Sequence, residues 1–205
     1  TLSYSLTGTD ASALSINSST GVITFAQPQG PDYETKSSYS ITVNVTDGTN
    51  TTSQALTINI TDVNEFSPVI SSSATFSAAE NQTAVGTVTA TDGDTSETLS
   101  YSLTGTDASA LSINSSTGVI TFNSAPDYET KTSYSVTVNV SDGTNTTSQA
   151  LTINVTNVNE YSPVISSSAT FSADENQTTV GTVTATDAEG DPLSYSLTGT
   201  DVSSL

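Results

Sequence analysis

The sequence contains no cysteine, histidine, arginine, methionine or tryptophan, and only two of its 205 residues are lysine. Without cysteine it has no disulfides, thiolate metal ligands or thiol nucleophiles. Without histidine, catalysis would depend on a pair of carboxylates, as in glycosidases, and we do not expect an enzyme. The 21 acidic residues give a net charge of −19, which repels nucleic acid backbones and anionic membrane surfaces. Cations are the natural counter-ligands.

Long apolar runs are also missing, so we expect no segment that inserts into a membrane. The chain instead repeats itself. The string L-S-Y-S-L-T-G-T-D begins at Leu2, Leu99 and Leu193, and D-Y-E-T-K begins at Asp32 and Asp127. A repeat of about 95 residues has the size of a small independent domain. We therefore predict a partial repeat over 1–65 that lacks its first strand, a complete repeat over 66–160, and the N-terminal half of a third over 161–205, as a window onto a longer array.

Apolar residues alternate with small polar ones in the complete repeat, as in Tyr134, Val136, Val138 and Val140. Seven such runs are separated by turn signals at intervals of about ten residues, and no segment has a helical period. This pattern predicts an all-β fold, a tandem array of Ig-like seven-stranded Greek-key sandwiches. The expected core residues are Leu103, Leu111, Ile113, Ile120, Phe122, Tyr134, Val136, Val138, Leu151 and Ile153.

Most of the carboxylates lie at strand ends and connectors rather than on strand faces. They recur in five motifs: S-A-x-E-N, A-T-D followed by further acids, D-Y-E, V-x-D-G, and a linker that reads D-V-N-E-F-S-P or N-V-N-E-Y-S-P. Strand ends gather at the two poles of a sandwich, where two carboxylates about 4 Å apart repel by roughly 4 kcal/mol at an effective dielectric of about 20. A divalent cation bound by oxygen ligands removes this repulsion, and the absence of His and Cys favours calcium over a transition metal.

In this order and spacing, the five motifs resemble those of cadherin repeats over the whole chain. Glu65 and Glu160, in the fourth linker position, resemble bacterial cadherin-like domains more than animal cadherins. Phe66 and Tyr161 depart from the family, whose final linker residue is an Asn that contributes mainly a backbone oxygen. The resemblance implies calcium ions between consecutive repeats, held by the base of one repeat, the linker and the top of the next.

The resemblance also implies a ligand set for each of two junctions. The first set is Asp32, Glu34, Asp62, Asn64, Glu65, Asp92, Asp94 and Asp142. The second set is Glu80, Asp127, Glu129, Asn157, Asn159, Glu160, Asp187 and Glu189, with Asp191 assisting. Because Asn157 stands where the first linker has Asp62, we expect the second junction to hold fewer ions or to hold them more weakly.

These inferences predict a calcium-dependent structural and adhesive array, the rigid extender of a large extracellular or cell-surface adhesin. Its partners would be neighbouring repeats, and also like chains or surface glycans. Two alternatives remain: a carbohydrate-binding module with an exposed aromatic platform, and a self-assembling extracellular filament or matrix subunit. Each motif taken singly also has a simpler interpretation than metal binding. Asp and Asn in turns often form hydrogen bonds with their own backbone, and D-Y-E could be a solvated loop near Lys36 or Lys131.

Overall fold

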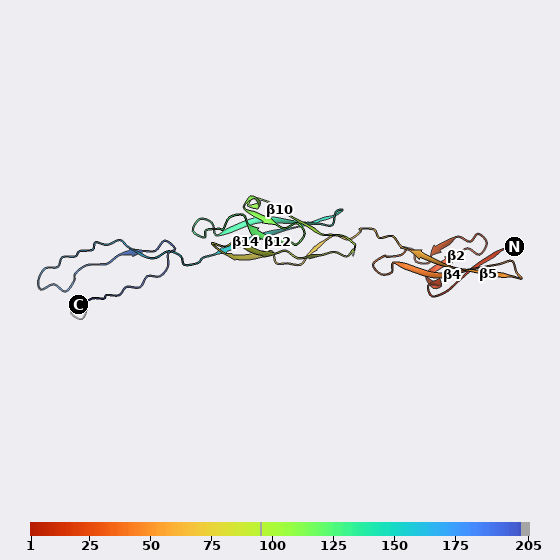
Figure 1. Ribbon diagram of the computed structural model, residues 1–205, viewed down its shortest axis with the longest axis horizontal. Coiled ribbons are helices and arrows are strands. Elements are labelled where there is room, and N and C mark those ends of the chain that lie inside the picture. Colours follow the sequence, from red (N-terminus) through yellow and green to blue (C-terminus); the bar gives the residue numbers. More distant parts are fainter. Residues whose placement is uncertain (95, 202–205) are drawn as a thin grey trace.

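The computed structural model describes residues 1–94 and 96–201, and it shows an elongated chain with three groups of strands in succession along its long axis (Figure 1). Every sheet is formed within one of the three predicted repeats. We call these the first unit (1–65), the middle unit (66–160) and the third unit (161–205), whose residues 202–205 lie outside the described part. The exact boundaries remain predictions.

The middle unit is a sandwich of two main sheets with a small strand pair. One sheet has the order β10 (Ser100–Thr104), β13 (Ser133–Ser141), β14 (Thr146–Thr156), β7 (Thr75–Ala79), and the other has β11 (Leu111–Ile113), β12 (Val119–Phe122), β8 (Ala84–Thr87). The pair is β6 (Val69–Ile70) with β9 (Ala90–Thr91), and a short 3-10 helix, η2 (Ala108–Ala110), precedes β11. All pairings are antiparallel except that of β14 with β7. The predicted all-β, Ig-like fold is confirmed.

The core lies between these sheets, where alternate residues of each strand point inward. Residues 136, 138 and 140 of β13 and 151, 153 and 155 of β14 are each at most 4% exposed. Full burial of each such side chain contributes about 1.5–3 kcal/mol. Seven of the ten predicted core residues are buried, and Leu103, Ile113 and Tyr134 are partly buried and pack against them. The period-two pattern therefore identified the core correctly.

Two of the seven predicted strands are each divided in the structure. The run 69–76 becomes β6 and β7, and the run 85–90 becomes β8 and β9. The reason lies in the pairing partners. β6 pairs with β9 whereas β7 pairs with β14, and β8 pairs with β12. A chain that passes from one sheet to another must break its ladder between them, and alternation alone does not show such a break.

The first unit repeats the second half of this architecture. Its larger sheet has the order β1 (Ser3–Thr7), β4 (Ser38–Thr46), β5 (Thr51–Asn59), and η1 (Ala11–Ala13) leads to the hairpin of β2 (Leu14–Ile16) and β3 (Ile23–Phe25). The register is also repeated, since Tyr4 pairs with Val45 as Tyr101 pairs with Val140. The same sequence therefore produces the same pairing in both units.

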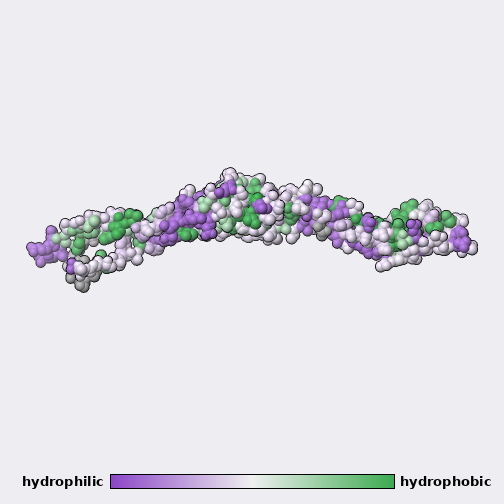
Figure 2. All heavy atoms as spheres, in the orientation of Figure 1, coloured by the Kyte–Doolittle hydropathy of each residue, from purple (hydrophilic) through white to green (hydrophobic). Residues whose placement is uncertain are grey.

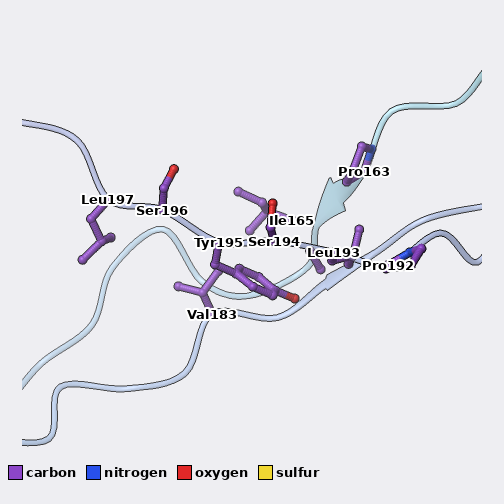
Figure 3. A pocket seen from close by; sticks show the side chains of 10 residues that line it. Pro163, Ile165, Val183, Pro192, Leu193, Ser194, Tyr195, Ser196 and Leu197 are labelled. Carbon is purple, nitrogen blue, oxygen red and sulfur yellow. The ribbon is translucent and has the colours of Figure 1, made fainter.

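The third unit has one described strand pair, β15 (Val164–Ile165) with β16 (Ala185–Thr186). Apolar side chains, among them Ile165, Val183 and Tyr195, line an open pocket there (Figure 3). Their equivalents in the middle unit, Ile70, Val88 and Tyr101, belong to or pack against the sandwich core. We therefore assign this pocket to a sandwich core and not to a ligand site.

Candidate metal centres at the two junctions

Three carboxylates from three different segments meet at the first junction. Glu34 comes from the D-Y-E loop of the first unit, Glu65 from the linker, and Asp94 from the D-G-D turn of the middle unit. One oxygen of each lies within 4.8 Å of the others. Asp94 is only 3% exposed. Hydrophilic residues gather where the units meet (Figure 2). The structure thus brings together three members of the first predicted ligand set.

Hydrogen bonds attach the linker to the top of the middle unit. The Phe66 N–H donates to Asp94 Oδ2 (2.9 Å), and Ser96 Oγ donates to Asp62 Oδ2 (2.5 Å). The Asp94 N–H in turn donates to Asp92 Oδ1 (3.0 Å), which closes the D-G-D turn. The Phe66 ring lies on this turn, and a Cβ at Gly93 would come within 2.5 Å of it. Glycine is therefore required at position 93 for the ring to pack there.

Asn145, in the turn between β13 and β14, also contacts the first linker. The Asn145 side-chain amide donates to Asn64 Oδ1 (2.9 Å) and to the Phe66 carbonyl (2.8 Å), and it lies 3.3 Å from Asp142 Oδ2. Asp142 is 7% exposed. Burial raises the pKa of this carboxyl, but the N–H groups of Asn145 and Thr144 outweigh it, and the net pKa is lowered.

The sequence analysis did not identify Asn145 as a functional residue. The signal was present, because V-x-D-G-T-N occurs twice, with Asn50 in the first unit and Asn145 in the middle unit. Its Asp was assigned to metal and its Asn was overlooked. Only the three-dimensional arrangement shows that the turn of one unit reaches the linker that precedes it.

Several carboxylate oxygens of the first junction are buried and have no hydrogen-bond partner. They are Glu34 Oε1 and Oε2, Asp62 Oδ1, Asp92 Oδ2 and Asp94 Oδ1. Burial, followed by repulsion from Asp62, Glu65 and Asp94, raises the pKa of Glu34. Buried anionic oxygens without donors are costly. An all-oxygen set of this kind fits a hard divalent cation such as calcium, so the residues present suit the ion that the sequence predicted.

Glu80 organises the base of the middle unit at the second junction. It is 1% exposed, and its Oε2 accepts the Tyr128 N–H whereas its Oε1 accepts the Val158 N–H, both at 2.7 Å. One side chain thus joins the D-Y-E loop to the linker. Carboxylate oxygens of Glu80, Asp127 and Glu129 lie within 4.8 Å of one another. These three residues belong to the second predicted set.

A second group at this junction, Asp187, Glu189 and Asp191, lies in the third unit. Glu189 Oε1 accepts the N–H groups of Glu160 (2.6 Å) and Tyr161 (3.2 Å), and the Asn159 amide donates to Asp191. Burial, followed by repulsion from Glu80, Asp127 and Glu189, raises the pKa of Glu129. Glu189 therefore acts electrostatically on the base of the middle unit, and Glu189 Oε2 is buried without a partner.

Two further predicted ligands, Asp32 and Asn157, are exposed. Asp32 is exposed and caps its own loop, since its carboxylate accepts the Thr35 N–H (3.1 Å) and Thr35 Oγ1 (3.0 Å). Their roles as ligands remain predictions, and for Asp32 the simpler turn interpretation describes the observed contacts.

The two lysines pair with acids that lie outside the five acidic motifs. Lys36 contacts Asp10 and Lys131 contacts Asp107, each at 2.5 Å. Lys131 also lies 4.6 Å from the centroid of the Tyr134 ring. The lysine of D-Y-E-T-K therefore does not neutralise the D-Y-E carboxylates, which remain available at the junctions. T-G-T-D and D-Y-E-T-K both occur in the first unit and in the middle unit, and this shared recurrence is the sequence signal for the pairing.

Comparison with known proteins agrees with this architecture. Residues 74–156 match the family model of the Cadherin domain. The chain is 33% identical over 175 residues to Protocadherin Fat 4 of Mus musculus, and 32% identical over 196 residues to the Protocadherin-like wing polarity protein stan of Drosophila melanogaster. These alignments cover 79% and 88% of this chain, but only 4% and 5% of the relatives.

Solved structures show the same fold. A crystal structure of mouse Cadherin-23 EC22-24 matches with a TM-score of 0.66 at 27% identity, covering 91% of this chain and 65% of that one. A crystal structure of human CDH23 EC21-23 matches with a TM-score of 0.75 at 22% identity, covering 91% and 68%. The bacterial type that Glu65 and Glu160 suggested is not tested by these animal relatives. Over the described residues, no helix is long and apolar enough to cross a membrane.

Proposed function

The chain carries a cadherin domain and is an extracellular repeat segment of that family, and from this premise we propose that it is a calcium-stiffened extender within a larger adhesive protein. The chain spans about one twentieth of the curated relatives that it matches, so the adhesive role of the whole protein is part of this proposal. The proposed repeats are 1–65, 66–160 and 161–205.

The observation that carries the proposal is the group of buried carboxylate oxygens without hydrogen-bond partners at the first junction, on Glu34, Asp62, Asp92 and Asp94. A surface that only needed solubility would expose these groups to water. Here they converge from two units and the linker between them. Bound calcium would supply the positive charge that compensates them.

Residues that share a calcium ion would then hold two neighbouring units in one relative arrangement. At the first junction Glu34 would attach the first unit, Asp62, Asn64 and Glu65 the linker, and Asp92, Asp94 and Asp142 the middle unit. At the second junction Glu80, Asp127 and Glu129 would act with Asn159, Glu160, Asp187, Glu189 and Asp191. Each junction without cations holds like charges close together, which favours separation of the units. Compensation of the charge would convert a hinge into a stiff connection.

The carbohydrate-binding alternative would need exposed aromatic side chains on a flat surface. In the middle unit Phe76, Tyr101, Tyr128 and Tyr134 pack against the core instead. Assembly of like chains into a filament remains open, and it is compatible with a stiff extender. One of the matched structures is a cis-dimer, that of Protocadherin gammaB7 EC3-6, and such contacts between copies of this chain would be a further proposal.

Thermal unfolding with and without calcium tests the proposal. Extracellular calcium sites have Kd values of about 10⁻⁴ to 10⁻³ M, so about 10 mM calcium should stabilise the protein by roughly 1.4–2.7 kcal/mol per ion. For a domain of this size we expect EDTA to lower Tm by at least about 5 °C relative to calcium. Equal Tm values in EDTA and in calcium would refute the proposal, and sodium chloride at matched ionic strength is the control.

A further inference from the structure

One side-chain nitrogen at the first junction has three oxygen partners. The Asn145 amide nitrogen lies 2.9 Å from Asn64 Oδ1, 2.8 Å from the Phe66 carbonyl oxygen and 3.3 Å from Asp142 Oδ2. Two of these oxygens belong to the linker and one to the middle unit. Asn145 itself belongs to the middle unit. This single amide therefore bridges the linker and the unit that follows it.

The orientation of the amide follows from the chemistry of its partners. A backbone carbonyl oxygen only accepts hydrogen bonds, and an ionised carboxylate also only accepts. Phe66 and Asp142 thus require the NH₂ group of Asn145, and not its oxygen, to face the linker. The two hydrogens of this group match the two shorter contacts, those with Asn64 and Phe66.

Hydrogen bonds within the middle unit order the backbone of the turn that carries Asn145. The N–H groups of Thr144 (2.7 Å) and Asn145 (2.6 Å) both donate to Asp142 Oδ1, and Ser141 Oγ donates to the Asn145 carbonyl (2.9 Å). Backbone and neighbouring side chains are therefore ordered within the middle unit alone. A pre-ordered donor loses little entropy when its acceptors arrive.

We propose that Asn145 is a metal-independent latch, which holds linker residues 64–66 against the middle unit when divalent cations are absent. The latch acts together with the bond from the Phe66 N–H to Asp94, so that Phe66 is held through both its N–H and its carbonyl. The amide carries no net charge, and its NH₂ group contributes donors only. It therefore holds the oxygens of Asn64, Phe66 and Asp142 together without compensating the charge of the carboxylate cluster. The inference goes beyond the proposed calcium function and does not depend on it.

The first unit offers a matched control. Asn50 ends an equivalent turn, in which its N–H donates to Asp47 Oδ1 (2.7 Å) and its carbonyl accepts Thr46 Oγ1 (2.9 Å). Its exposed side chain precedes β5, whereas the linker follows β5, so Asn50 lies at the other end of this nine-residue strand. Asn50→Ala thus makes the same chemical change in the same turn, away from the linker contact.

Distance measurements across the first junction test the latch. Because the chain has no cysteine, spin labels can be attached uniquely at Val63→Cys in the linker and Ser102→Cys in β10, two exposed positions that report on docking of the linker against the middle unit. In EDTA we expect a narrow distance distribution for the unsubstituted junction and for Asn50→Ala. Asn145→Ala should broaden it and lower the docked fraction about fivefold or more, because net hydrogen bonds are lost. Asn145→Asp, which keeps the shape and the backbone turn but lacks the NH₂ group, should broaden it likewise.

Two results would overturn the latch: a broad distribution for the unsubstituted junction in EDTA, or a narrow one for both Asn145 variants. Circular dichroism of each variant checks that the middle unit is folded. A repeat of the measurement in calcium separates this inference from the proposed function. Failure of calcium to narrow the distribution of Asn145→Ala would count against the calcium proposal and leave the latch supported.

Discussion

Asp94 shows how one residue connects local structure with the junction. One of its carboxylate oxygens accepts the Phe66 N–H, and the other is buried without a partner beside Glu34 and Glu65. The first oxygen orders the linker whether or not an ion is present. The second adds to the repulsion among like charges and is a candidate ligand. Stability without calcium and affinity for calcium should therefore respond in opposite directions to a change at this residue.

Asp94→Asn is expected to raise Tm in EDTA by a few degrees and to weaken calcium binding by about tenfold or more. The amide oxygen can still accept the Phe66 N–H, while one negative charge leaves a buried cluster. Thermal unfolding in EDTA and calorimetric titration measure the two effects. Asp174→Asn removes the same charge from an exposed position outside the carboxylate clusters, and it should change neither quantity. A lower Tm together with unchanged affinity would contradict this account of Asp94.

Asp62 and Asn157 occupy equivalent linker positions in different surroundings. Asp62 is half-buried, accepts Ser96 Oγ and has a buried oxygen without a partner, whereas Asn157 is exposed. Because Asn157 carries a neutral amide in place of a carboxylate, we expect the second junction to gain less from a cation at this point.

Asn157→Asp should strengthen calcium binding at the second junction, and Asp62→Asn should weaken it at the first, each by about tenfold. The reason is the gain or loss of one carboxylate in a partly buried site. Titration calorimetry of both variants and of the unsubstituted chain with calcium measures these changes in affinity. Unchanged binding in both variants would show that this linker position does not contribute a ligand.

At the scale of single residues, the sequence predicted which side chains gather but not all of their partners. The recurring acidic motifs identified Glu34, Glu65 and Asp94, because equal spacing in two repeats places motifs at equivalent strand ends. Asp107 was missed because its partner, Lys131, comes from another motif. Asn145 was missed because its contact depends on how a turn of one unit reaches the linker before it.

The contact between Lys131, which precedes β13, and Asp107, which precedes η2, shows how the scarce lysine is used at the scale of elements. Lys131 contacts Asp107 and lies over the Tyr134 ring, and the Asp107 carboxylate also accepts the Ser135 N–H (2.8 Å). The hydrogen bond from Lys131, followed by that from Ser135, lowers the pKa of Asp107 below its usual value of 3.8. The segment that follows D-Y-E is thereby attached to Asp107, which precedes η2.

Lys131→Met should lower the free energy of unfolding by about 1 kcal/mol near pH 7, since it keeps the aliphatic stem but removes a partly exposed charged hydrogen bond. Because the pKa of Asp107 is lower in the folded state, its contribution is complete above about pH 4 and is lost as the pH falls through the folded pKa. The difference from the unsubstituted chain should therefore shrink at pH 3. Urea unfolding at both pH values measures it, and an equal difference at both would contradict this origin.

Strand existence was predictable at this scale, but strand continuity was not. Alternation identified the inward residues of β13 and β14, since one face of each packs on the opposite sheet. The breaks between β6 and β7 and between β8 and β9 arise from changes of pairing partner. Partners are a property of the assembled sandwich, and a period-two pattern contains no information on them.

At the scale of the whole molecule, the three units follow one another along one axis, and hydrophilic surface gathers at their junctions (Figures 1 and 2). Such a chain transmits force or spans distance only if its junctions resist bending. The first junction has the latch of Asn145 in addition to its carboxylates. In the second, the described contacts of the linker with the third unit are those of Asn159, Glu160 and Tyr161 with two acidic side chains. Without cations, we therefore expect bending at both junctions, with linker residues 64–66 still held against the middle unit.

Small-angle X-ray scattering with calcium and with EDTA tests the central claim most directly. In calcium, the account predicts a maximum dimension that matches the extended arrangement. In EDTA it predicts a smaller radius of gyration and a broader distance distribution, because carboxylates of neighbouring units repel each other and the junctions bend. Scattering curves that coincide in calcium and EDTA would contradict the claim that cations stiffen this chain.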